Sequence, residues 1–268
     1  MNEHLIRMAE EKYGIKADSY DIEKLKDHLL SLDNVNIKLL ENIFSSGEAT
    51  SFLTVNETYF FREPVHFYLL KEKLSVFNQS EVRICSAATS YGCEAYSIAM
   101  LLDMFSKNAE RRFSYKIDAF DINPFVIETA CRGIYKQNSL REDGSCFSYL
   151  TDIYLKKEDT NFIVDSKLKN NINFFVHNIL NELKDEYYDV IFFRNAFIYF
   201  IPDYREKVIS NLSNALKENG ILIMGVSETS TVKHSNLEQI IEHQITLKEE
   251  VFFFKKISKT NYAQSMRN

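Results

Sequence analysis

The chain has 268 residues, a formal net charge of −6 and a pI near 5.6; 45% of its residues are apolar and 26% are charged. This composition is typical of a globular protein with a sizeable core, and the length allows one large domain with a small companion. The acidic balance disfavours nucleic acid as the main partner, because a general nucleic-acid binder presents a basic face.

The cysteines and histidines predict neither a disulfide framework nor a metal site. The four cysteines, at positions 85, 93, 131 and 146, form no CxxC pair, and the six histidines form no HxH or HxxxH cluster. The charged N-terminal segment lacks the apolar core of a signal peptide, and no run of about 18 apolar residues is present. We therefore expect a cytoplasmic protein without metal and without direct membrane insertion.

The first 50 residues predict a small helical domain, because leucine, isoleucine and methionine recur there at three-to-four spacing among charged residues. The small, polar segment SSGEATS, residues 45–51, predicts a helix end and the start of a linker. We expect this linker to cover residues 51–79.

From about residue 80, short apolar runs alternate with helical patterns. The predicted strands are 82–88, 116–122, 171–177, 188–194 and 220–226, and the predicted helices are 94–105, 124–135 and 204–219. Strands that are apolar without interruption are typical of a parallel sheet covered on both faces. Residues 80–258 therefore predict an α/β, doubly wound, Rossmann-like domain.

Two segments interrupt the alternation. Residues 136–170 are polar and charged around the strand-like TNFIVD, 160–165, and predict an inserted lobe with a small sheet of its own. Residues 244–257 predict a β-hairpin that closes the main sheet antiparallel, and 259–268 form a polar tail.

In an open α/β sheet, ligands bind outside the carboxyl ends of the strands. The first such end, SAATSYGCE at 86–94, has one glycine, Gly92, and is as typical of an ordinary strand-to-helix turn as of a cofactor loop. The second places Asp121 at a strand tip, where an acid can hold ribose hydroxyls or cap the next helix, a task that Asn123 can also perform. The single-glycine loop favours a methyltransferase sheet over a nicotinamide-binding one.

The strand VIFFR ends in Arg194 and Asn195, and Tyr199 follows closely. A charge directly behind four apolar residues is costly to bury, so Arg194 is expected to face a site or an ion-pair partner such as an aspartate. Tyr199 fits a packed aromatic as well as a catalytic group. NETYFFRE, 56–63, predicts either a packed turn that aims polar groups at a ligand or a helix start capped by Asn56 or Thr58.

Taken in order, five segments resemble the CheR-type chemotaxis receptor methyltransferases. They are VNETYFFREPVHF (55–67), RICSAATSYGCEAYSIAM (83–100), FDINPFVIETACRGIY (120–135), YYDVIFFRNAFIYF (187–200) and GILIMGVSE (220–228). The resemblance implies a small N-terminal helical domain, a linker, and a Rossmann-like domain bearing a small β-subdomain. It also implies transfer of a methyl group from S-adenosylmethionine to glutamates of receptor cytoplasmic domains, by a protein that we expect to be a monomer.

The resemblance assigns site residues as well. The residues that match the family's cofactor-binding positions are Asn56, Thr58, Arg62, Glu94, Asp121, Ile122, Asn178, Ile179, Arg194 and Asn195. Asp121 or Glu94 would take the ribose hydroxyls, and Asn178 and Ile179 would flank the adenine. Arg62 and Tyr199 match the residues beside the transferring methyl and are the catalytic candidates.

Two regions depart from the family pattern. The chain reads SYGCEAYS where the family usually reads STGEEPYS, so Tyr91, Cys93 and Ala95 change the shape expected of the methionine pocket while Glu94 is kept. Residues 1–50 hold six Lys and Arg against ten Asp and Glu, which weakens steering toward an acidic receptor. Net charge does not determine the charge of a single face, so a local basic stripe around Lys24 and Lys26 would suffice for such steering.

Two alternatives therefore accompany the chemoreceptor hypothesis. One is a related methyltransferase that serves another signalling pathway or another substrate, favoured by the acidic N-terminal region. The other is a catalytically silent cofactor-binding interaction module, favoured by the altered SYGCEA loop.

Overall fold

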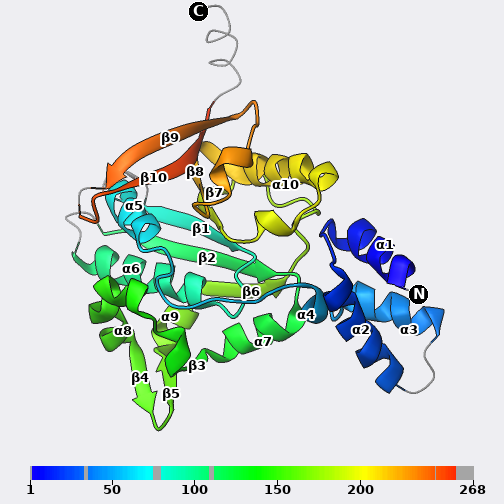
Figure 1. Cartoon of the computed structure of the whole chain (residues 1–268). Coiled ribbons are helices and arrows are strands. Elements are labelled where there is room, and N and C mark those ends of the chain that lie inside the picture. The colour runs from blue at the N-terminus through cyan, green and yellow to red at the C-terminus, as the bar shows by residue number, and fades with distance from the viewer. Residues whose placement is uncertain (1, 33–35, 75–79, 109–111, 245, 258–268) are drawn as a thin grey trace, which may run out of the picture.

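A computed structural model describes residues 2–32, 36–74, 80–108, 112–244 and 246–257. Its centre is a seven-stranded sheet in the order β6-β2-β1-β7-β8-β10-β9 (Figure 1). The strands are β1 Glu81–Ala87, β2 Ser114–Asp121, β6 Ile172–Val176, β7 Tyr188–Phe193, β8 Leu216–Met224, β9 Leu237–Gln244 and β10 Glu249–Lys256. Neighbours from β6 to β8 run parallel, and β10 is antiparallel to β8 and β9. The predicted α/β class and the five predicted parallel strands are confirmed.

Helices cover both faces of this sheet. They are α5 Val65–Leu74, α6 Cys93–Asn108, α7 Pro124–Arg132 and α10 Pro202–Ala215. Because side chains alternate along a strand, Val190 and Phe192 of β7 pack into the core that includes α5 and α6. Ile191 and Phe193 pack into the core that includes α10 and the N-terminal helices. Both faces are buried, which explains the uninterrupted apolar run of β7.

The predicted helix over 204–219 is wrong at its end. Helix α10 stops at Ala215, and the next four residues begin β8. Leu216 is fully buried and pairs with Tyr188 of β7, so tertiary packing outweighs the helical propensity of the sequence LKEN.

The predicted helix over 124–135 also ends early. Gly133 follows the last residue of α7 with a left-handed φ of 62°, and its N–H donates to the Thr129 carbonyl. A glycine in this conformation terminates a helix. The next residues form strand β3, Ile134–Lys136, of the smaller sheet.

The smaller sheet lies in the predicted inserted lobe. Its three strands are antiparallel in the order β3-β5-β4, with β4 Leu155–Glu158 and β5 Asn161–Val164. The rest of the lobe is helical: η1 Gln137–Ser139, η2 Glu142–Phe147, α8 Ser148–Tyr154 and α9 Ser166–Lys169. The prediction of a small sheet is confirmed, although its first strand begins two residues before 136.

The C-terminal hairpin is confirmed but displaced from 244–257. Its first strand is β9, residues 237–244, which precedes most of the predicted range. The segment LEQIIEHQ is half exposed at the edge of the sheet. Its exposed positions are mostly polar, so the sequence lacks the apolar run that identified the central strands. The predicted tail, 259–268, lies outside the described residues.

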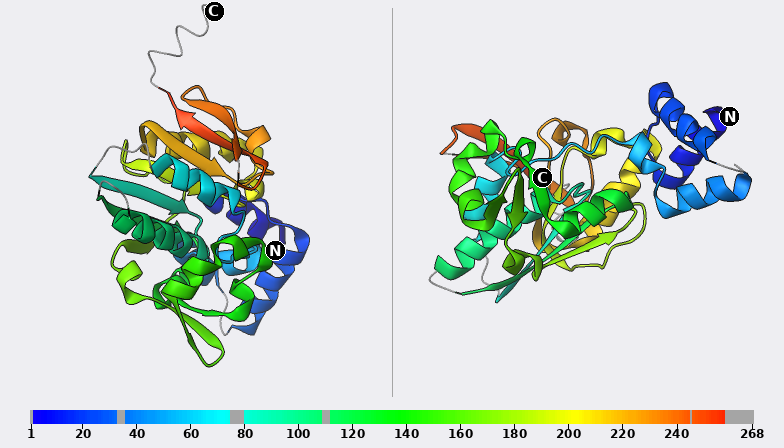
Figure 2. Two further views of the ribbon diagram at one scale, coloured as in Figure 1. Left: turned by 90° about the vertical axis from the view of Figure 1, so that its left-hand side faces the viewer. Right: turned by 90° about the horizontal axis from the view of Figure 1, so that it is seen from below.

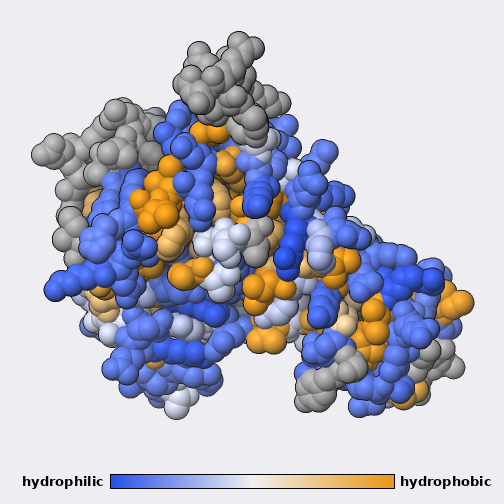
Figure 3. Space-filling model, turned by 45° about the horizontal axis from the view of Figure 1, so that its top comes forward, coloured by the Kyte–Doolittle hydropathy of each residue, from blue (hydrophilic) through white to orange (hydrophobic). Residues whose placement is uncertain are grey.

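The N-terminal helices project from one end of the sheet (Figures 1 and 2). They are α1 Asn2–Tyr13, α2 Ser19–Ser31, α3 Ile37–Ser46 and α4 Thr50–Leu53. The predicted break over 45–51 is therefore shorter, because only Gly47 to Ala49 lie between α3 and α4. Figure 3 shows a notch in the surface between these helices and the lobe bearing β4 and β5. Within the part of the chain described, no helix combines the length and apolarity that crossing a membrane needs.

Gly47 joins the helical N-terminal region to the sheet domain through a close approach. Its φ is 83°, and a Cβ there would overlap the backbone carbonyl oxygen of Ile122, just beyond β2. We expect Gly47→Ala to lower the free energy of unfolding by about 2 kcal/mol, because an L-residue in this conformation costs about 1–2 kcal/mol before any overlap. Urea unfolding followed by circular dichroism measures this. The exposed Ser45→Ala is the control, and equal stability of the two variants would refute the close approach.

Candidate functional site

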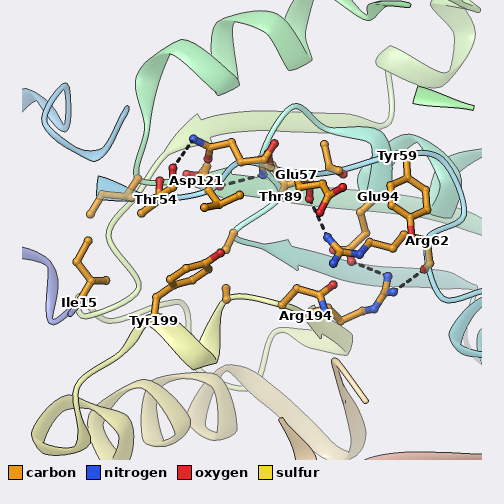
Figure 4. A pocket seen from close by; sticks show the side chains of 18 of the residues that line it. Ile15, Thr54, Glu57, Tyr59, Arg62, Thr89, Glu94, Asp121, Arg194 and Tyr199 are labelled. Atoms are coloured by element: carbon orange, nitrogen blue, oxygen red, sulfur yellow. Dashed lines mark hydrogen bonds and ion pairs between the residues drawn. The ribbon is translucent and has the colours of Figure 1, made fainter. Parts of the chain in front are cut away.

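The carboxyl ends of β1, β2 and β7 border a cavity that the covering segment, residues 54–62, overlies (Figure 4). Its walls are Ile15, Thr54, Val55, Asn56, Glu57, Thr58, Tyr59, Arg62, Phe67, Ala88, Thr89, Ser90, Glu94, Asp121, Ile122, Arg194, Asn195, Ala196, Tyr199 and Phe200. Eight of the ten predicted cofactor residues and both catalytic candidates are among them. Three of the strand ends singled out in the sequence, at 86–94, at Asp121 and at Arg194, border this cavity.

A second, more apolar cavity adjoins the first. The two share Ile15, Thr54, Ala88, Asp121, Ile122 and Phe200. The second is also lined by Tyr13, Phe120, His177, Asn178, Ile179 and Phe193. This set includes the two predicted residues, Asn178 and Ile179, that are absent from the first cavity. The joined space is polar at the Arg62 end and apolar at the Tyr13 end.

Asp121 lies where the two cavities meet. The Ser90 N–H donates to its Oδ2 at 2.9 Å and the Asn123 N–H donates to its Oδ1 at 3.0 Å. Burial raises the pKa of this carboxyl, while the backbone hydrogen bonds oppose that effect. The helix N-cap is Asn123, whose side chain accepts from the Phe125 N–H. The capping alternative for Asp121 is therefore wrong, and each carboxylate oxygen keeps acceptor capacity toward the cavity.

Arg194 is held between two glutamates. Its Nη1 lies 3.0 Å from Glu94 Oε2 and its Nη2 lies 3.3 Å from Glu63 Oε2, and its side chain is only 2% exposed. Nη2 also donates to the Arg62 carbonyl. The expected ion-pair partner exists, as two glutamates rather than an aspartate, and Arg194 also lines the cavity.

The two glutamates have different environments. Burial raises the pKa of Glu94, against the effects of Arg194 and of the Ser86 hydroxyl, which donates to Oε1 at 2.7 Å. The pKa of Glu63 is lowered because the favourable effects of Arg194 and of the Asn195 amide outweigh burial. Glu63 thus stays ionised and holds the covering segment to the end of β7.

Arg62 and Tyr199 point into the same cavity from opposite walls (Figure 4). Arg62 donates from Nη1 to the Glu57 carbonyl at 2.8 Å and lies 5.6 Å from the centre of the Tyr59 ring. Within the described ranges, no carboxylate lies within ion-pair distance of Arg62. Burial raises the pKa of Tyr199, although Arg62 opposes the shift, so the phenol is protonated at neutral pH.

Two phenylalanines anchor the segment that carries Arg62. Phe60 and Phe61 are buried, Phe61 stacks on Phe147 of the inserted lobe at 4.7 Å, and the Phe61 N–H donates to the Ser97 hydroxyl of α6. The reading of NETYFFRE as a packed turn is confirmed, and no helix starts at Asn56 or Thr58.

The remaining predicted residues serve local structure as well. The Asn178 amide donates to the Lys12 carbonyl at 2.9 Å and accepts from the Leu180 N–H. The Asn56 carbonyl accepts from the Ser90 hydroxyl.

The thiol of Cys93 is buried and hydrogen bonded to Thr58, and burial raises its pKa to about 12. Cys93 is therefore a protonated structural group, whereas Tyr91 is 38% exposed outside both cavities.

Sequence reasoning missed the contribution of the N-terminal region to the cavity. Tyr13 is the last residue of α1 and Ile15 lies just beyond it, where it forms an antiparallel bridge with Phe200; both line the apolar cavity. The Lys16 N–H donates to the Tyr199 carbonyl at 2.8 Å. The glycine in KYGIK marks only the end of α1, and no local pattern indicates a partner 185 residues later in the chain.

Residues 56–247 match the sequence model of the family described as CheR methyltransferase, SAM binding domain. The chain belongs to this family. It is accordingly an S-adenosylmethionine-dependent methyltransferase, as the resemblance implied.

Three curated relatives illustrate the range of similarity. The chemotaxis protein methyltransferase of Borreliella burgdorferi is 34% identical over 217 residues, covering 77% of this chain and 73% of the relative. That of Escherichia coli strain K12 is 35% identical over 208 residues, covering 72% and 68%. A probable biofilm formation methyltransferase of Pseudomonas aeruginosa is 27% identical over 258 residues, covering 90% of this chain and 60% of the relative.

The methyltransferase carries a buried histidine beside the ion-pair cluster. His66 is 1% exposed, its Nδ1 lies 3.3 Å from Glu63 Oε2, and burial, with Arg194 adding to the effect, lowers its pKa from 6.5 to about 3. Because folding lowers the pKa of His66, the unfolded chain binds a proton at this residue more readily than the folded one. The free energy of unfolding is therefore undiminished by His66 above pH 6.5 and decreases as pH falls from 6.5 toward 3.

We expect the free energy of unfolding of the wild type to fall more steeply below pH 6.5 than that of His66→Leu. The slopes should differ by up to about 1.4 kcal/mol per pH unit. Urea unfolding between pH 7 and about pH 4 measures the slopes, with the exposed His243→Leu as control. Parallel curves for the wild type and His66→Leu would show that His66 does not titrate in this way.

Proposed function

We propose that the protein is a protein-glutamate O-methyltransferase that forms glutamate methyl esters on the cytoplasmic domains of chemotaxis receptors. Relatives named chemotaxis protein methyltransferases support this activity. The structural observation that carries it is the pair formed by Arg62 and Tyr199. An arginine without an ion-pair partner among the described residues faces a protonated phenol across the cavity.

From one end to the other, the polarity of the joined cavities matches the successive parts of S-adenosylmethionine. The flat faces of a purine carry no hydrogen-bonding groups, which suits the walls formed by Tyr13 and Ile179. Ribose hydroxyls need an acceptor, and Asp121 stands at the junction of the two cavities. Charged groups of an amino acid suit the end lined by Glu94 and Arg194. We assign Asn56, Thr58, Ile122, Asn178 and Asn195 to the same binding surface.

When bound, the cofactor supplies an electrophilic methyl group on a positively charged sulfur. A glutamate side chain has a pKa of about 4.3, so at neutral pH the acceptor is already a carboxylate and no general base is needed. Arg62 would hold this carboxylate by charge-assisted hydrogen bonds, and Tyr199 would donate a further one. The covering segment would exclude water from the pair, so alignment and desolvation are the main contributions of the protein.

One observation favours a second candidate, a methyltransferase of another signalling pathway. Lys24 and Lys26 of α2, the candidates for a local basic stripe, are paired with Asp21 at 3.3 Å and Glu23 at 3.0 Å. The helix therefore presents little net positive charge to an acidic receptor. The similarity to the biofilm formation methyltransferase also extends over more of this chain than that to the chemotaxis proteins.

Methyl transfer distinguishes the candidates directly. We expect the protein to move label from S-[methyl-³H]adenosylmethionine to receptor cytoplasmic fragments, because an ester at glutamate is the product of the proposed reaction. Base treatment should then release volatile methanol. Label in a different protein or in a metabolite would support the second candidate, and cofactor binding without transfer to any acceptor would support the silent interaction module.

Substitutions at the two ends of the joined cavities should have different effects. Arg62→Ala should lower kcat by about 100-fold or more with the fold intact, since it removes the group that holds the acceptor. Asp121→Ala should mainly weaken S-adenosylhomocysteine binding, by about tenfold or more, because it removes a charged acceptor. Turnover assays and isothermal titration calorimetry measure these effects.

Two variants serve as controls for this pair. Arg132→Ala removes an exposed arginine paired with Glu128 on α7, and Asp118→Ala removes a second acid of β2, bonded to the Tyr188 hydroxyl. Both should keep near-normal binding and turnover. An Arg62→Ala enzyme with normal kcat, or an Asp121→Ala enzyme with normal affinity, would overturn the assigned role.

A further inference from the structure

Glu228 is a buried acid that none of the predicted roles includes. It follows β8 in the segment GVSE, is 1% exposed, and is not among the residues that line the two joined cavities. A buried carboxylate is costly unless hydrogen-bond donors surround it. Its donors therefore indicate what the residue does.

Those donors are backbone N–H groups, and most of them belong to one loop. Oε2 accepts from the Asn195 N–H at 2.8 Å and from the Gly225 N–H at 3.0 Å, and Oε1 accepts from the Ile198 N–H at 3.2 Å. The Phe197 N–H also donates to this carboxylate. Both oxygens thus act as acceptors for the segment directly after β7.

The bonded segment has two unusual features. Asn195 adopts a left-handed φ of 57°, which is uncommon for a residue other than glycine. Phe197 to Tyr199 then form the short 3-10 helix η3, whose own N-cap residue, Ala196, makes no side-chain hydrogen bond. The Glu228 carboxylate, which lies in the turn after β8, supplies the missing cap and fixes the turn at Asn195.

We propose that Glu228 is a positioning residue for methyl transfer: its carboxylate holds the 195–198 backbone so that the Tyr199 phenol faces Arg62. This inference rests on the proposed function, because Tyr199 acts there on the acceptor carboxylate. The carboxylate is closely packed against Gly225, because a Cβ at that glycine would lie 2.7 Å from Glu228 Oε2.

Glu228→Gln is the sharpest test, because it keeps the size of the side chain but replaces one acceptor oxygen with an NH₂ donor. Either orientation of the amide directs a donor at a backbone N–H. We expect kcat for receptor fragments to fall by about 100-fold, as for a misplaced catalytic group, while KM and S-adenosylhomocysteine affinity change by less than about threefold. In a Tyr199→Phe background, the same substitution should lower kcat by less than about threefold.

The matched control is Asp189→Asn. Asp189 is also a buried acid, 3% exposed, but it lies at the opposite end of β7, where it accepts from the Arg83 N–H and pairs with Lys217. It should change stability without changing kcat by more than about twofold. Equal losses of kcat at Glu228 and Asp189, or full additivity of Glu228→Gln with Tyr199→Phe, would assign Glu228 a general structural role and overturn the proposal.

Hydrogen exchange tests the same contact without any acceptor. Amides in a peptide covering 195–200 should exchange at least about tenfold faster in Glu228→Gln than in the wild type and in Asp189→Asn. Glu228→Asp, which keeps the charge but withdraws it by one methylene, provides a second variant if the first does not fold. Unchanged exchange in the folded Glu228 variant would reject the proposal, whereas a wild type that transfers no methyl would count against the proposed function alone.

Discussion

The site depends on one buried charge, the Arg194 guanidinium. It directly follows the central strand β7 and pairs with Glu63, the residue after the covering segment, and with Glu94 at the start of α6. Three elements that are distant in the sequence are therefore held at one point. Because two carboxylates share this arginine, its loss would leave two partly buried charges without their cationic partner, which destabilises the folded chain. The covering segment keeps its place over the cavity through this contact and through the buried Phe60 and Phe61.

The two arginines of the cavity have different tasks. Arg194 is neutralised by its glutamates, whereas Arg62 contacts a backbone carbonyl and an aromatic ring and has no acid partner within the described ranges. Arg194 also donates to the backbone carbonyl of Arg62, so the two arginines belong to one network. Under the proposed function, Arg62 would bind the acceptor carboxylate without first breaking an ion pair within the described residues.

The parts of the fold and of the site that depend on the residues of a single strand could be predicted from the sequence. Uninterrupted apolar runs gave the parallel sheet, and a charge directly behind such a run, at Arg194, indicated the site edge. Features that depend on distant partners were not predictable in the same way. Strand β9 looks polar because it is an edge, Leu216 joins a strand because Tyr188 pairs with it, and Ile15 reaches the cavity through a bridge to Phe200. The family resemblance located Arg62 and Tyr199, whose isolated patterns fit ordinary packing equally well.

The bridge between Ile15 and Phe200 has a consequence for how the molecule can be divided. The sequence predicts a small N-terminal helical domain over 1–50, a linker over 51–79 and a methyltransferase domain over 80–258. In the folded chain, the wall of the apolar cavity includes Tyr13 and Ile15, and the Tyr199 carbonyl accepts from the Lys16 N–H. A fragment beginning at residue 51 would retain every strand of the sheet yet have an open cavity and an unpaired loop. The end of α1 and the residues after it thus belong to the wall of the cavity as well as to the N-terminal region.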